Sequence, residues 1–230
     1  TTENLYYSVE SVNDGTFCIS AFDNYNHESE LSNPITATAY ETYSYELHDG
    51  NNLISFRGLP ENNDIENMFE SLEEYITGVI GEGVAASHLG NGNWVGSLSN
   101  ILPTKGYWVI LGNAAQDTYV PYTITQAYPT DQNTIFSIHD GANLISFIGE
   151  NNTGISEAIP DEIEEYFVGI IGEGIAASQV SSQNWVGSMQ YWNIQKGYWL
   201  KIHIEPDDEI IEFQWQLPSP GQFIPGKNNQ

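Results

Sequence analysis

Alternating apolar and polar residues predict β-strands along much of the chain. Three alternating runs, rich in β-branched and aromatic residues, open the sequence at 6–12, 16–23 and 33–40. Later runs are shorter, more apolar and separated by glycines. Apolar residues spaced by three and four predict helices at 65–75 and 155–166. We therefore expect a mostly β protein with antiparallel sheets and short helices.

The pattern that follows residue 40 occurs twice. Residues 48–108 contain His-Asp-Gly, Asn-Leu-Ile-Ser-Phe, Gly-Glu-Gly, Trp-Val-Gly-Ser and Lys-Gly-Tyr-Trp, and the same blocks return in 139–199. Their first residues, His48 and His139, are 91 positions apart, and the last block keeps this offset, so there is no net insertion. A period this long indicates a duplicated domain, because solenoid repeats are shorter and occur at least three times.

We divide the chain into four segments on this basis. They are residues 1–42 with the opening strands, a first repeat module at 43–128, a second at 129–219, and an extended tail with proline and glycine at 220–230. Each module is expected to be a small α+β unit in which one helix lies against an antiparallel sheet. Asp64 is expected to cap the first helix, and Pro160 to lie in the first turn of the second. The expected fold class is mostly β with α+β repeats.

The run 17–32 resembles the end of a fibronectin type III domain. Phe17 stands at an aromatic position and Ile19 at a valine position of that family, whereas 25–29 lacks its usual glycine. The resemblance covers about 40 residues, the last three strands of a sandwich that normally has seven. It implies a partial fibronectin III-like β-sandwich. Either the chain is a fragment of a longer protein or another element completes the exposed edge of the sandwich, and we favour the fragment.

Taken together, the duplicated blocks resemble a module of large secreted or surface proteins of marine and other environmental bacteria and of some of their phages. The resemblance spans residues 43–217. Those proteins often carry fibronectin type III domains beside it, so it implies an extracellular, modular architecture. It implies no activity that can be assigned to individual residues.

The charge balance excludes two classes of partner. The chain has 31 acidic and 5 basic residues among 230, a net charge of −26. Nucleic acids and anionic membrane surfaces are both bound by clustered Lys and Arg, and no apolar run reaches the roughly 20 residues of a membrane span. Multivalent cations are natural counter-ions for such a surface, which leaves Ca²⁺ open as a ligand. The single cysteine, Cys18, excludes an internal disulfide.

The recurring His-Asp-Gly blocks have two interpretations. His48 with Asp49, and His139 with Asp140, could hold a cation or transfer protons, and the two aspartates are our weak candidates for a metal. Asp-Gly is also typical of a tight turn, because its backbone angles suit both residues. We favour the turn, because it needs no further assumption.

The recurring Gly-Glu-Gly blocks also have two interpretations. Glu82 and Glu173 stand where glycines let the backbone bend, and a carboxylate there could ligate calcium or act catalytically. However, two of the five basic residues, Lys105 and Lys196, recur at equivalent positions of an otherwise acidic chain. We therefore predict two structural ion pairs, Glu82 with Lys105 and Glu173 with Lys196.

The aromatic residues could stack on sugars or fill cores, and we favour burial. The recurring set is Trp94, Tyr107, Trp108, Trp185, Tyr198 and Trp199. Because strand side chains alternate, Tyr107 should be buried and Trp108 should lie on the other face. Lys201 replaces Ile110 on that face, so Trp199 should meet solvent or an interface. Residues without an aromatic counterpart in the first copy are Tyr191, Trp192 and Trp215; with Trp199 they are our candidate ligand or interface aromatics.

No sequence motif supports catalysis. The chain has no Gly-x-Ser-x-Gly elbow, His-Glu-x-x-His helix, P-loop or Cys/His metal spacing. We expect a non-enzymatic structural, adhesion or assembly module of a larger bacterial surface, secreted or virion protein. Its expected partners are other domains of that chain, cell-surface or virion components, and glycans. The alternative is a carbohydrate-binding accessory module of a secreted enzyme.

Overall fold

The computed structural model describes residues 15–23, 25–37, 39–114, 118–205 and 210–217. Every pairing between named strands in these residues is antiparallel. Helical segments are short, and none of those described has the length and apolar character needed to cross a bilayer. The predicted fold class, mostly β with antiparallel sheets, is confirmed at this level.

Two five-stranded sheets form the centre of the body. The first has the order β4 (Gly50–Ser55), β9 (Gly106–Leu111), β6 (Ile76–Gly81), β7 (Val84–His88) and β8 (Trp94–Gly96). The second has the order β12 (Gly141–Ser146), β18 (Gly197–Ile202), β14 (Phe167–Gly172), β15 (Ile175–Ser181) and β16 (Asn184–Gly187). Strand order and register correspond throughout: Leu53 lies opposite Trp108, and Leu144 opposite Trp199.

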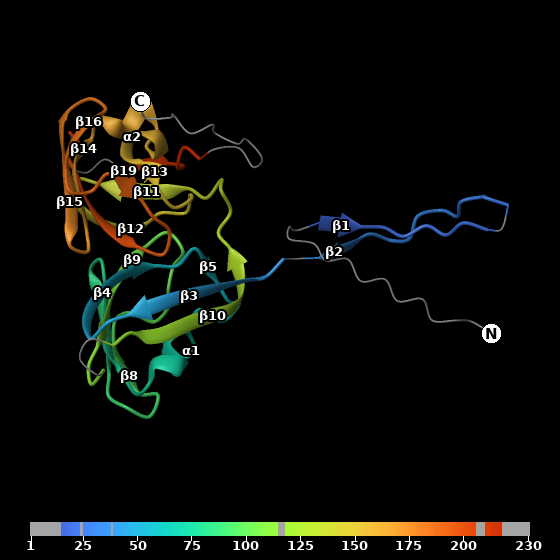
Figure 1. The fold of residues 1–230 in the computed structure, drawn as a ribbon, viewed down its shortest axis with the longest axis horizontal. Coiled ribbons are helices and arrows are strands. Elements are labelled where there is room, and N and C mark those ends of the chain that lie inside the picture. The colour runs from blue at the N-terminus through green and yellow to red at the C-terminus, as the bar shows by residue number, and fades with distance from the viewer. Residues whose placement is uncertain (1–14, 24, 38, 115–117, 206–209, 218–230) are drawn as a thin grey trace.

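Smaller sheets complete each half. In the first half, residues 41–129, β3 (Glu41–Leu47), β10 (Val120–Pro129) and β5 (Gly58–Leu59) form a three-stranded sheet. In the second half, residues 136–217, β11 (Phe136–His139) pairs with β19 (Ile210–Phe213), and β13 (Thr153–Gly154) pairs with β17 (Tyr191–Trp192). Figure 1 shows the second half, in yellow to red, stacked above the first, in blue to yellow-green.

Each half has its own hydrophobic core. Buried residues of 43–127 form one cluster, in which β3, β10, α1 and the five-stranded sheet all take part. Buried residues of 136–215 form a second, separate cluster. On β9 the alternation is as predicted, because Tyr107 is buried and Trp108 is only partly buried. The same holds on β18 for Tyr198 and Trp199.

The expectation of one helix per module is wrong in length and continuity. The first half has α1 (Ile65–Phe69) followed by a 3-10 turn (Glu70–Leu72), and the second has α2 (Ile155–Ala158) and α3 (Asp161–Glu164). Asp64 caps α1 as predicted, because its side chain accepts the Asn67 N–H at 2.7 Å. Pro160 separates α2 from α3, since a proline forces the preceding residue out of helical geometry and Ile159 is extended.

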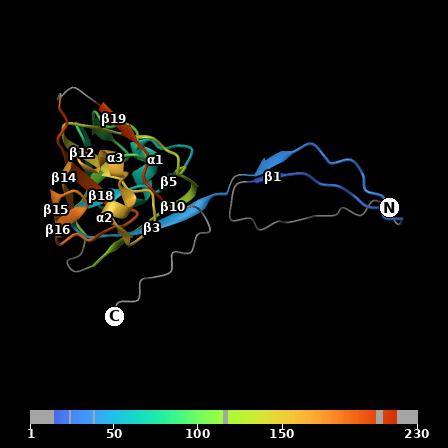
Figure 2. The same ribbon diagram turned by 90° about the horizontal axis from the view of Figure 1, so that it is seen from above.

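The N-terminal segment is a narrow ribbon that projects from the body (Figures 1 and 2). It contains β1 (Gly15–Phe17) and β2 (Ile35–Ala37), so the strands expected over 16–23 and 33–40 are much shorter than predicted. The strand expected at 6–12 and the tail at 220–230 lie outside the described residues. Ile19, Phe22 and Leu31 are about two-thirds exposed (65%, 65% and 66%). In the described chain no second layer covers them, and strands without such a layer gain little from burial.

Candidate functional site

The duplicated motifs meet where the two halves touch. Main-chain bridges join Ile54 to Lys196 and Lys105 to Ile145 across the junction. The two bridges involve equivalent positions, with the roles of the halves exchanged. Each half therefore presents the same segments to the other, and the junction is approximately two-fold symmetric.

Two serines of the Asn-Leu-Ile-Ser-Phe blocks bond to carbonyls of the opposite half. The Ser55 N–H donates to the Gln195 carbonyl at 3.1 Å, and its hydroxyl donates to the Lys196 carbonyl at 2.7 Å. The Ser146 N–H makes the equivalent bond, to the Thr104 carbonyl at 3.2 Å, whereas its hydroxyl donates to the carbonyl of Pro103 at 2.5 Å and not to that of Lys105. Both serines are fully buried. Their hydroxyls would carry a desolvation cost without these partners, so the junction satisfies them.

Glu82 also reaches across the junction. Its Oε1 lies 2.7 Å from His139 Nε2, and its Oε2 accepts the Leu144 N–H at 2.8 Å. The ammonium of Lys105, from the same half as Glu82, lies 3.3 Å from Oε2. The ion pair expected between Glu82 and Lys105 is thus present in the structure, but it forms part of a larger group that the sequence analysis did not anticipate.

Glu173 occupies the equivalent place in the second half. Its Oε1 lies 2.6 Å from His48 Nε2, and its Oε2 accepts the Leu53 N–H at 2.9 Å. The expected ion pair between Glu173 and Lys196 is not among the salt bridges of the described residues. This prediction is corrected: Lys196 is exposed, whereas Lys105 is partly buried beside its glutamate.

The local sequence explains how these side chains are aimed. Gly83 and Gly174 have φ near +69° in the turns that follow β6 and β14, a conformation that glycine adopts without strain. Each turn presents its glutamate to the opposite half. Asn52 is buried and holds the His48 loop, accepting the His48 N–H and donating to its carbonyl, both at 2.9 Å. Asn143 does the same for His139.

The geometry favours the protonated form of both histidines. Their Nδ1 atoms lie 2.6 Å from the carbonyl oxygens of Asp49 and Asp140, and their Nε2 atoms face carboxylates. A neutral imidazole has one N–H, so only the imidazolium satisfies both acceptors. Hydrogen bonding to the opposite glutamate, then to the carbonyl, raises the pKa of His48 and His139 against a smaller desolvation effect.

Glu82 shows the complementary shift. Its burial raises the pKa of the carboxyl group, but hydrogen bonds from His139 and the Leu144 N–H, with the charge of Lys105, outweigh burial and lower that pKa below its usual value. Because the pKa of Glu82 is lowered and that of His139 is raised, the pH range in which both groups are charged is widened. Each group favours the charged form of the other, which is the behaviour of a structural ion pair.

Stability should depend on pH through these pairs. Because folding raises the pKa of His48 and His139, their contribution is complete below the unfolded value of about 6.5 and is lost as the pH rises through the raised values. Both side chains are nearly half exposed (45% and 48%), so each pair contributes only about 0–1 kcal/mol. We expect the melting temperature to fall as the pH rises from about 6 to about 8.5.

The control for this prediction is the double variant H48Q/H139Q. Lower pH also relieves the repulsion of an acidic surface in both proteins, so the quantity of interest is the difference between their melting temperatures. This difference should be largest near pH 5.5–6.5 and should shrink in acid, once the pH falls through the lowered pKa of Glu82 and its carboxylate gains a proton. A difference that is constant from pH 5 to 8.5 would contradict the assignment.

The candidate metal ligands have main-chain partners. Asp49 Oδ1 accepts the Ala114 N–H at 3.3 Å. Asp140 Oδ1 accepts the Ile204 N–H at 2.9 Å, a bond that lowers the pKa of its carboxyl group. The described residues contain no group of three or more His, Cys, Asp or Glu side chains arranged to hold a metal ion. The two aspartates thus tie turns to neighbouring segments, and calcium binding stays a prediction.

The structure divides the candidate interface aromatics into two groups. Trp192 and Trp215 are buried at 0% and 3% exposure, and they belong to the core of the second half. They are therefore core residues in this structure, which corrects the prediction that they serve a ligand or interface. Tyr191 is exposed at 52% and Trp199 is partly buried, so these two keep accessible surface.

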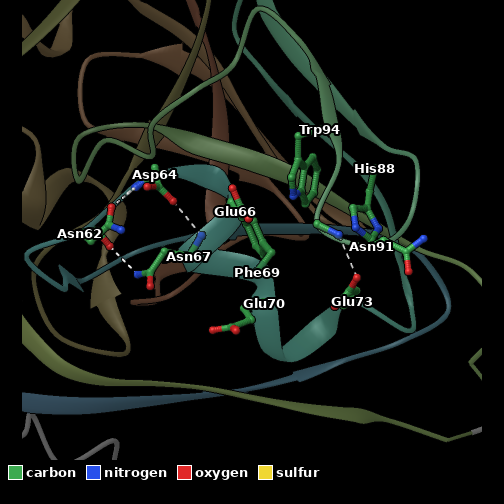
Figure 3. A pocket seen from close by; sticks show the side chains of 11 residues that line it. Asn62, Asp64, Glu66, Asn67, Phe69, Glu70, Glu73, His88, Asn91 and Trp94 are labelled. Atoms are coloured by element: carbon green, nitrogen blue, oxygen red, sulfur yellow. Dashed lines mark hydrogen bonds between the residues drawn. The ribbon is translucent and has the colours of Figure 1, made fainter.

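A pocket of about 570 Å³ lies in the first half, away from the junction (Figure 3). One wall comes from α1 and the turn after it, and the other from β7, β8 and the loop between them. Trp94 and His88 stand on the β7–β8 side with ring centroids 4.9 Å apart, and carboxylates and amides line the rest. The sequence analysis considered Trp94 for sugar stacking, but it did not identify the pocket.

A comparison with family models, with curated proteins and with solved structures finds no match for this chain. The sequence analysis also missed the junction roles of Ser55, Ser146, Asn52 and Asn143. One signal was available, because histidine, asparagine, serine and glutamate recur together at the same offset. That signal does not say whether the recurring residues meet within a copy or between copies.

Proposed function

We propose that the chain is a non-enzymatic structural, adhesion or assembly module of a larger extracellular protein. In this proposal residues 43–128 and 129–219 are two copies of one module, joined into a single rigid body. The ribbon at 15–37 is the end of a fibronectin III-like domain and connects that body to preceding parts of the protein. The parent protein would be a bacterial surface or secreted protein, or a virion component.

The reciprocal junction carries this proposal. Glu82 and Glu173 each accept one imidazole N–H and one main-chain N–H from the opposite half. The buried serines use the same surface. The side chains that recur in both copies thus connect the copies to each other. A module that transmits force, or that keeps other domains at a fixed distance, requires such a connection.

The same contacts argue against an enzyme built on the duplicated histidines and glutamates. Both oxygens of each glutamate are hydrogen-bonded across the junction, and both nitrogens of each histidine face acceptors. A substrate would have to displace these bonds before it could use either group for proton transfer. In an enzyme a general base must instead be free to bond with the reacting group.

Single-molecule pulling on the full chain tests this proposal. If the two copies act as one body, the wild type should unfold both halves in one event. The double variant E82A/E173A removes the carboxylates that bind the opposite half, so it should unfold in two smaller events. The released chain length distinguishes the cases, since each residue adds roughly 3.3–3.6 Å when extended.

The matched control is E74A, because Glu74 is exposed and makes no hydrogen bond or ion pair to the second half among the described residues; this variant should unfold like the wild type. Two separate events in the wild type would contradict the proposal.

A second test is a panel of chromogenic glycosides and esters, which measures whether the chain has hydrolase activity. Turnover that E82Q/E173Q abolishes, without a change in unfolding, would show an enzyme instead.

A further inference from the structure

The Trp94 pocket differs from the corresponding place in the second half. On β8, Trp94 pairs with His88 of β7, and on β16 the equivalent Trp185 pairs with Gln179 of β15. The second residue of α1 is Glu66, whereas the second residue of α2 is Ser156. The two sites therefore have equivalent strand pairing but differ in the side chains that these segments carry.

In the second half, the protein's own side chains fill the region beside Trp185 that corresponds to the Trp94 pocket. Glu164 is 1% exposed, and its Oε1 accepts the Trp185 indole N–H at 2.8 Å and the Ser156 hydroxyl at 2.6 Å. Gln183 also reaches over and donates to the Asp161 carboxylate at 3.0 Å. The indole N–H is thus satisfied internally, and the surface of the indole is closed on that side.

In the first half the equivalent glutamate turns away. Glu73 is exposed and accepts the Gly92 N–H at 2.9 Å. Glu66 stands where the second half has a small serine, and its Oε1 lies 3.2 Å from the position that a Cβ on Gly92 would take. In the described part of the chain, no acceptor is recorded for the Trp94 indole N–H. Trp94 therefore faces an open pocket with an unused donor.

The lining indicates the chemistry of a ligand. Carboxylates of Asp64, Glu66, Glu70 and Glu73 surround the pocket, together with the amides of Asn62, Asn67 and Asn91, and no Lys or Arg lines it (Figure 3). Among the described residues, no group donates a hydrogen bond to the carboxylates of Glu66 and Glu70. A ligand must therefore donate many hydrogen bonds, carry no negative charge, and offer an apolar face to the indole.

We propose that this pocket is a saccharide-binding site of the first half. The C–H face of a sugar ring would pack on Trp94, and its hydroxyl or ammonium groups would donate to the carboxylates. Neutral and amine-bearing sugars fit these requirements. Uronates and sulfated sugars do not, because like charges this close repel. The proposal does not depend on the junction, and it would supply a ligand class for adhesion.

A glycan array probed with the full chain tests the proposal, with neutral, amino and acidic oligosaccharides printed side by side and positives remeasured by calorimetry. We expect the chain to bind neutral or amino oligosaccharides, and the array distinguishes these two classes. W94A should weaken it about tenfold or more, which corresponds to about 1.4 kcal/mol of aromatic contact. W185F, in the closed site, should bind like the wild type.

A second variant guards against misfolding of W94A. The triple variant E66S/H88Q/G92Q gives the first half the side chains that close the second, and Gln183 already adopts the positive φ (60°) that this position needs. It should keep the melting temperature and lose binding. Three outcomes would each overturn the proposal: no saccharide bound by the wild type, binding confined to acidic sugars, or binding by W94A and the triple variant at the wild-type level. The variant E82A/E173A should still bind the saccharide. A failure of the junction proposal can therefore be distinguished from a failure of the saccharide proposal.

Discussion

Replacing Trp192 by alanine should lower the free energy of unfolding by about 3–5 kcal/mol, as truncation of a buried tryptophan usually does. Trp192 is fully buried and packs on Phe147 at 5.7 Å, on Tyr198 at 4.8 Å and on Trp215 at 5.0 Å between ring centroids. Its indole N–H donates to the Ile155 carbonyl at 3.1 Å. The substitution would leave a cavity and an unsatisfied carbonyl together.

Urea denaturation followed by circular dichroism measures this loss. The neighbouring residue provides the control, because Tyr191 is 52% exposed and Y191A should change stability by about 0.5 kcal/mol or less. The pair of variants separates the core role of Trp192 from the surface role first considered for both residues. A W192A protein within about 1 kcal/mol of the wild type would contradict the assignment to the core.

Replacing Gly96 by alanine should cost about 3 kcal/mol, at the upper end of the usual range for overpacking. A Cβ at this position would lie 2.1 Å from the Ala85 carbonyl oxygen and 2.6 Å from the Ala86 Cα. Both are main-chain atoms of β7, and the Ala85 carbonyl accepts the N–H groups of Ser97 at 2.8 Å and Leu98 at 3.1 Å. β8 would have to move away and lose these bonds.

The adjacent V95A variant is the control for this prediction. Val95 is 61% exposed on the same strand, so its truncation should change the unfolding free energy by about 0.5 kcal/mol or less. G187A should behave like G96A, since its Cβ would lie 2.2 Å from the Ala176 carbonyl oxygen. If thermal melting placed G96A and V95A at the same temperature, the close approach of these strands would be refuted.

These glycines give the Trp-Val-Gly-Ser blocks a packing explanation. The tryptophan of each block faces the helical segments, the valine faces solvent, and the glycine lets two strands approach. The serine connects the end of the block to the neighbouring strand. Ser97 Oγ accepts the Ala85 N–H at 3.2 Å, and Ser188 Oγ accepts the Ala176 N–H at 3.1 Å. Recurrence of this block therefore does not require a shared ligand.

A volume exchange explains why the role of Trp192 was misjudged. Its counterpart in the first half is Ile101, which is also fully buried. The fifth position from the helix start is Phe69 in the first half and Ile159 in the second. The second half is thus larger than the first at one of these positions and smaller at the other, and cores tolerate several apolar substitutions at once when total volume is kept. Trp192 lacks an aromatic counterpart in the first half, which suggested a special function. The smaller residue, Ile159, is distant from it in the sequence, so the two differences were not considered together.

Local physics made several features predictable from the sequence alone. Alternation along 105–111 predicted which face of β9 is buried, and Asp64 predicted a helix cap, because each depends on residues within a few positions. Which glutamate meets which histidine was decided only by the tertiary structure. A glutamate has one equivalent histidine in each copy, and local patterns do not distinguish them. The packing of the halves selects the opposite copy, because only there do a main-chain amide and an imidazole converge on one carboxylate.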